Sequence, residues 1–122
     1  MPMTDSTELG VDREIHVQLD PCLPHDADAV ADVLRECFPA DVPAPGPAAA
    51  PGHVRSFLIK DRPGDWPSAL RPAALSGQVD VDLIGPADGV RHVRGLLAST
   101  FEVKDRGTVP GEHEVELRLR LG

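Results

Sequence analysis

The sequence predicts an α+β domain in which two helices pack on one face of a sheet. Several short runs alternate apolar and polar residues, which is typical of strands with one buried face. Two longer runs place apolar residues at helical spacing instead. The order β-α-β-β-α-β-β favours a ferredoxin-like split β-α-β plan with an antiparallel or mixed sheet. In that plan the first and third strands are central and run parallel.

The first strand and the first helix are predicted from their periodicity. Residues 14–19 alternate strictly, so one side of this strand is expected to be buried. A helix is expected from about Asp26 to Phe38, because apolar residues recur there every three or four positions. Asp26 is a candidate cap for its first turn, and Pro39 should end it.

The middle of the chain is rich in proline. Residues 39–52 hold five prolines in their first thirteen positions and are predicted to be a stiff Pro/Ala-rich connector, with a ligand for an SH3-type groove as the alternative. Strands are expected at 53–60 and 78–84. Between them the sequence predicts a turn at 62–65 and a short helix that begins at Trp66.

The last third of the chain is predicted to hold one helix and a hairpin. The helix is expected at 86–100, where apolar residues again form a stripe. The hairpin strands are expected at 101–104 and 114–121, with the turn at 107–111.

Length and charge limit the organisation and the partners. A chain of 122 residues indicates one domain, expected at 13–122 after a disordered tail at 1–12. The net charge is −8, and residues 1–50 hold ten acidic residues against two basic ones. Such a balance disfavours nucleic acids and anionic membranes as partners. The chain has no apolar run of membrane-spanning length and no visible secretory signal, so we expect a cytoplasmic protein.

The cysteines and histidines predict neither a disulfide nor a metal site. Cys22 and Cys37 flank opposite ends of the predicted first helix, roughly 16 Å apart, which is too far for a bridge. Cys37 is expected in the core, whereas Cys22 is either a passive turn thiol or a reactive one before a helix start. The five histidines show no ligand spacing, so no metal and no cofactor are expected.

Two segments are candidates for partner binding. Trp66 lies between turn-forming prolines with Arg62 beside it, and interface hot spots are enriched in Trp and Arg. The alternative for Trp66 is that it covers an edge of the core. The other candidate is the acidic face of the first helix, formed by Asp28, Asp32 and Glu36.

A third group of polar residues is expected to gather on the uncovered face of the sheet. Alternation places on this face His16, Asp80, Asp82, Arg118 and Arg120. Such a set could serve acid–base chemistry or bind a divalent ion. Opposite charges on neighbouring strands also simply stabilise a solvated sheet. Because a flat exposed face should give no desolvation to shift a pKa, the sequence favours the stabilising role.

The function favoured by the sequence is a non-catalytic protein-interaction or regulatory module, such as an adaptor or accessory subunit. No phosphate-binding or nucleophile motif is present in the sequence. The expected partner is a protein, with a basic surface as one option, and a homodimer formed through a sheet edge is a further option. The alternatives are a small dimeric ferredoxin-like enzyme, of monooxygenase or cyclase type, and a regulatory domain that senses a small molecule.

Overall fold

The computed structural model describes residues 13–38, 41–42, 54–61 and 74–122. The expected tail, most of the proline-rich connector and the segment around Trp66 and Arg62 lie outside these residues. The described residues form an α+β fold with two helices and one sheet of five strands. In chain order the elements are β1 (Arg13–Leu19), α2 (Pro24–Cys37), β2 (Arg55–Asp61), β3 (Val79–Gly85), α3 (Ala87–Thr100), β4 (Val103–Pro110) and β5 (Val115–Leu121).

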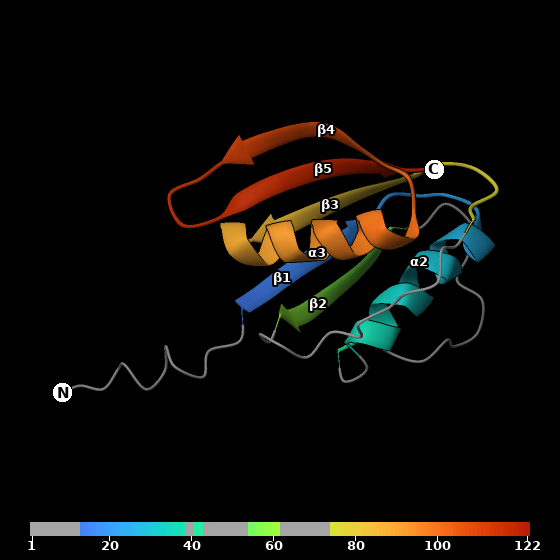
Figure 1. Cartoon of the computed structure of the whole chain (residues 1–122), viewed down its shortest axis with the longest axis horizontal. Coiled ribbons are helices and arrows are strands. Elements are labelled where there is room, and N and C mark those ends of the chain that lie inside the picture. The colour runs from blue at the N-terminus through green and yellow to red at the C-terminus, as the bar shows by residue number, and fades with distance from the viewer. Residues whose placement is uncertain (1–12, 39–40, 43–53, 62–73) are drawn as a thin grey trace.

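The sheet is antiparallel throughout, with the strand order β2-β1-β3-β5-β4 (Figure 1). β1 and β3 are neighbours, as expected, but the parallel pairing predicted for them is wrong. The ferredoxin-like plan is therefore not confirmed. The reason is that side chains alternate in the same way in parallel and antiparallel strands, so the pattern that predicts a strand does not give its direction.

Among the described elements, a split β-α-β unit is formed by those in the second half of the chain. β3 and β4 each pair antiparallel with β5, so they point the same way with β5 between them. α3 connects them across the sheet (Figure 1). In the first half, α2 instead leads from β1 to β2, which pairs antiparallel beside β1.

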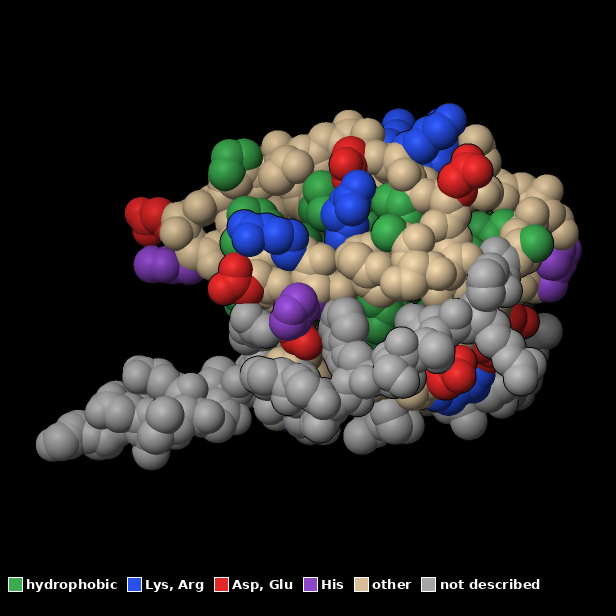
Figure 2. All heavy atoms as spheres, viewed as in Figure 1, with side chains coloured by type: hydrophobic (Ala, Val, Ile, Leu, Met, Phe, Trp, Pro, Cys, Tyr) green, Lys and Arg blue, Asp and Glu red, His purple; other side chains and the backbone are tan. Residues whose placement is uncertain are grey.

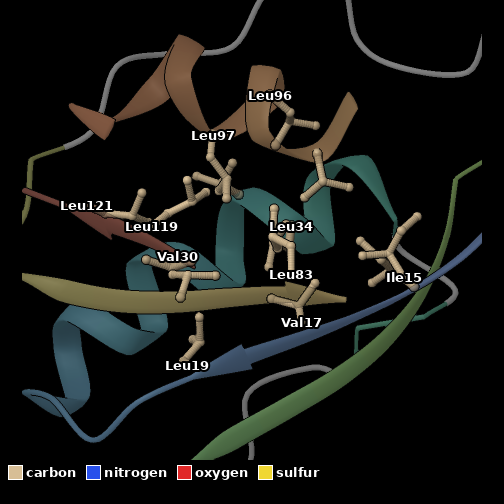
Figure 3. Packing of buried hydrophobic residues seen from close by; sticks show 14 of the residues in the cluster. Ile15, Val17, Leu19, Val30, Leu34, Leu83, Leu96, Leu97, Leu119 and Leu121 are labelled. Carbon is tan, nitrogen blue, oxygen red and sulfur yellow. The ribbon is translucent and has the colours of Figure 1, made fainter. Parts of the chain in front are cut away.

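Both helices cover the same face of the sheet. Figure 3 shows Val30 and Leu34 of α2 and Leu96 and Leu97 of α3 converging on side chains of the strands. The largest fully buried side chains of the sheet come from alternate positions of four strands: Ile15, Val17, Leu19, Ile59, Val79, Leu83, Leu119 and Leu121. Each helix has 14 residues, and no described helix is long and apolar enough to cross a membrane. Neither of the two described helices covers the other face of the sheet.

The first helix starts earlier than the sequence predicts. It begins at Pro24, with Leu23 at the cap position and no side-chain cap. Proline suits this first position because its fixed φ matches the helix and the missing N–H would have no partner there. The expected capping role of Asp26 is therefore wrong, and its carboxylate bonds elsewhere in the fold.

The terminal hairpin is longer than predicted. β4 continues to Pro110, and the turn closes with the Gly111 N–H donating to the Glu114 carbonyl at 2.7 Å, so the turn expected at 107–111 is misplaced. A bulge between Asp105 and Gly107 shifts the register of β4 on β5. Gly107 has a φ of +153°, a conformation that L side chains rarely adopt. This backbone conformation explains why a glycine occupies this position of the strand.

Candidate functional site

The face of the sheet that neither described helix covers, here called the open face, carries rows of polar side chains from neighbouring strands. In its central row Asp82 of β3 lies between Gln18 of β1 and Arg118 of β5. In the next row Asp80 lies opposite Arg120. The structure thus brings together the two aspartates and two arginines that the sequence placed on this face.

Asp80 is the centre of a paired cluster of charges. Arg120 donates to its carboxylate from Nε at 2.9 Å and from Nη2 at 3.4 Å, and Arg106 donates from Nη1 at 3.1 Å. The hydrogen bond from Arg120 holds the pKa of Asp80 below its ordinary value, in spite of partial burial. Arg106 was not predicted as part of this cluster, because β4 was expected to end before it and the bulge at this residue has no clear sequence signal.

Asp82 is in the opposite electrostatic situation. Burial raises its pKa, and the nearby carboxylate of Asp20 raises it further, while Arg118 only partly offsets these effects. Arg118 donates instead to Glu116 at 3.3 Å. Within the described parts of the chain, no hydrogen bond or ion pair engages the carboxylate of Asp82 or Asp20. The expectation that the open face causes no desolvation is therefore wrong at Asp82.

His16 lies on the open face but is not placed for acid–base chemistry with the aspartates. Its direct neighbours across the strands are Ile84 of β3 and Leu58 of β2. Leu58 is 54% exposed, one of the few large apolar side chains on the surface. His16 therefore belongs to a largely apolar row beside the row that holds Asp82.

The acidic residues of α2 are exposed but two of them are already paired. Arg55 of β2 donates from Nη1 to Asp28 at 2.7 Å. Arg35 donates to Asp32 one turn away. The Glu36 carboxylate makes no hydrogen bond and no ion pair with a described residue. Arg35 and Arg55 leave this face less negative than its acidic residues alone suggest.

Two buried aspartates were not predicted as buried. Asp26 is 2% exposed and accepts hydrogen bonds from the backbone N–H groups of Ser76 and Gly77, each at 2.9 Å. Asp61 is fully buried at the end of β2, and its Oδ2 lies 3.0 Å from Nδ1 of His92. The burial of Asp61 follows the same alternation as Ile59, so extending the predicted strand by one residue would have found it.

The two cysteines have unreactive surroundings. Both thiols are free, and Cys37 lies in the core as expected. Burial and Glu36 raise the pKa of Cys37 to about 11, and burial also raises the pKa of Cys22. Because the thiolate is the reactive form, these shifts support a passive role for Cys22.

Chemically, the open face combines one saturated charge cluster, at Asp80, with one unsatisfied acidic pair, Asp20 and Asp82. The described residues contain no group of three or more side chains suited to hold a metal ion. Comparison with protein-family models, curated proteins and solved structures finds no match. A basic group from outside the chain is the natural complement of the unsatisfied pair.

Replacing Asp80 with Asn should lower the melting temperature by roughly 2–5 °C at neutral pH, because the ion pairs to Arg120 and Arg106 are lost. The pKa of Asp80 is lowered in the folded state, so its stabilisation is present at neutral pH and disappears as pH falls through the lowered pKa, below about 4. The melting temperatures of the wild type and of Asp80→Asn should therefore converge in acid. The matched control is Glu102→Gln, which removes an exposed carboxylate. If the difference in melting temperature between the wild type and Asp80→Asn stayed constant with pH, the pairing of Asp80 would be contradicted.

Proposed function

We propose that the protein is a non-catalytic interaction module that receives a basic segment of a protein partner on its open face. The observation that supports this proposal is the pair formed by Asp20 and Asp82. Burial and the charge of Asp20 raise the pKa of Asp82, Arg118 only partly offsets them, and no described residue makes a hydrogen bond or ion pair with either carboxylate. A lysine or arginine from a partner would relieve that repulsion and would form charge-assisted hydrogen bonds.

The surroundings of this pair suit a protein surface. Gln18 lies beside Asp82 and offers both donors and acceptors. Leu58 and Ile84, in the adjacent row, offer apolar contact area. Arg118, on the other side, is 56% exposed and can meet an acidic group of the partner. The partner segment that fits best therefore carries a basic residue flanked by apolar ones.

Turnover is less well supported than binding. Catalysis uses polar groups held in a water-poor pocket, and the groups here lie on one face of a sheet. His16 has apolar cross-strand neighbours and makes no hydrogen bond or ion pair with Asp82, so the described part of the face lacks a ready pair of acid and base. These observations weigh against the alternative of a small enzyme with its centre on the open face.

Assembly through a sheet edge is also less well supported. At the β2 edge, the Lys60 N–H donates to the Asp41 carboxylate at 2.9 Å, so that edge donor is occupied. At the other edge, β4 is interrupted by its bulge at Arg106 and ends at Pro110. Occupied donors, bulges and prolines all oppose the addition of a further strand. We therefore place the partner on the face of the sheet.

The test places a photo-reactive residue at position 18, in the central row, and at position 98 on the exposed side of α3 as the control. We expect partner cross-linking from position 18 alone. The partner so identified should then bind the purified protein, and Asp20→Asn with Asp82→Asn should weaken binding at least about tenfold. The loss should also grow smaller at high salt, where the charges are screened.

A matched variant separates the two acidic surfaces. Asp28→Asn with Asp32→Asn removes the same charge from α2 and should leave partner affinity unchanged. The open-face variant should remain folded, because ionised Asp82 costs stability at neutral pH when its folded pKa is raised. If the α2 variant weakened partner binding and the open-face variant did not, the binding site would lie on α2. A substrate-dependent activity lost with Asp82→Asn would replace the proposal with an enzyme.

A further inference from the structure

A groove lies on the helix-covered side of the sheet, away from the open face. It runs between the first turns of α3 and the β4–β5 hairpin and has a volume of about 320 Å³. In Figure 2 hydrophobic side chains are visible between α3 and the hairpin, beside basic side chains on α3. The groove exists because the hairpin extends past the start of α3 (Figure 1), so that α3 leaves part of β5 uncovered.

The lining of the groove is mainly apolar and is held by a fixed contact. Val90 of α3 and Leu117 of β5 are almost fully buried, and Val115 of β5 is half-buried. Arg94 of α3 donates to both oxygens of Asp105 in β4, at 2.8 and 2.9 Å. This two-bond contact ties the hairpin to the helix, so the walls are set in place before any ligand enters.

Among the described residues that line the groove, one cation remains available to a ligand. Arg91 lines the groove, and its side chain is 74% exposed. Its contact with Asp88, one turn earlier on α3, is 3.7 Å long and joins two exposed groups. Such exposed pairs bind weakly, so an incoming carboxylate can compete for the guanidinium. Arg94 differs, since its guanidinium is already paired with the Asp105 carboxylate through two hydrogen bonds.

From this arrangement we propose that the groove binds a small apolar carboxylate. Its carboxylate would pair with Arg91, and its apolar body would lie against Val90, Val115 and Leu117. The volume is at the lower end of that of ligand pockets, which suits a short aliphatic or single-ring acid and excludes a dinucleotide or a long acyl chain. This site is separate from the open face, so it stands or falls independently of the proposed partner.

The test titrates hexanoate into the ¹⁵N-labelled full chain and follows the backbone amides. We expect saturable shifts at Val90, Arg91 and Val115, with a Kd on the order of 1 mM or below. Hexylamine has the same body and the opposite charge, so it should give no saturable shifts there. Equal binding of the two probes, or no saturation with hexanoate, would overturn the proposal.

Two variants locate the ligand. Arg91→Gln should weaken hexanoate binding about tenfold, whereas Arg118→Gln, an arginine on the open face, should leave it unchanged. Ala87→Leu narrows the groove at the first position of α3 and should abolish binding while the spectrum stays that of a folded protein. Retained affinity in Arg91→Gln or in a folded Ala87→Leu would place the hexanoate elsewhere and contradict the assignment.

Discussion

Replacing Asp26 with alanine should lower the free energy of unfolding by about 3 kcal/mol, because a buried charged acceptor of two hydrogen bonds is lost. Asp26 is 2% exposed, and its two oxygens accept separately from the N–H groups of Ser76 and Gly77. These bonds fasten the segment before β3 to the start of α2. Without them both backbone donors lose their partner in a partly buried site.

A matched change two residues away isolates this effect. Asp28→Ala removes the same side chain from the same helix, but Asp28 is 54% exposed and its partner among the described residues is Arg55, so the loss should stay below about 1 kcal/mol. Asp26→Asn keeps one carbonyl oxygen and should fall between the two. Urea denaturation of the three variants measures the differences. Equal losses from Asp26→Ala and Asp28→Ala would mean that the Asp26 bonds contribute little.

Alternation and helical spacing were sufficient to predict the type and order of the described elements and the buried face of the sheet. The helix predicted at 86–100 is found as Ala87–Thr100, and the strand predicted at 78–84 as Val79–Gly85. The alternating residues of β3 and β5 are buried on the expected side. What alternation does not contain is strand direction, and for this reason the parallel pairing of β1 with β3 was wrong.

The open face was predictable in composition and less so in its contacts. Asp80 and Arg120 share a face by simple alternation, so their proximity follows once β3 and β5 are neighbours. The position of His16 depends on a register offset that alternation does not specify, and it places the imidazole beside Ile84 instead of a carboxylate. Arg106 reaches Asp80 only because of a bulge in β4.

Long-range polar contacts were the least predictable feature. An aspartate near a helix start is usually interpreted as a cap, since local sequence offers no other partner. The true partners of Asp26 lie 50 and 51 residues away along the chain. Likewise, the raised pKa of Asp82 depends on burial in the assembled sheet and on the nearby charge of Asp20, neither of which a single segment encodes. The unsatisfied acidic pair therefore emerges only from the assembled sheet.

Replacing Gly85 with alanine should destabilise the protein by about 2 kcal/mol, because β1 and β3 lie too close at this point for a side chain. A Cβ on Gly85 would lie 2.8 Å from the Glu14 carbonyl oxygen and 3.2 Å from the Ile15 Cα. Both are backbone atoms, which unlike side chains cannot rotate away, so the two strands would have to separate. Calorimetry of the wild type and the variant measures the loss.

The same substitution at Gly95 supplies the control. Gly95 lies on the exposed side of α3, and a Cβ there would meet nothing within 4 Å. Because alanine favours a helix more than glycine does, Gly95→Ala should stabilise the protein by up to about 1 kcal/mol. If Gly85→Ala destabilised the protein and Gly95→Ala stabilised it, the loss at Gly85 would come from the close spacing of β1 and β3. The same spacing sets Gln18 beside Asp82. If Gly85→Ala were as stable as the wild type, the strands could separate at this end at little cost, and the open face would be less rigidly spaced than its contacts indicate.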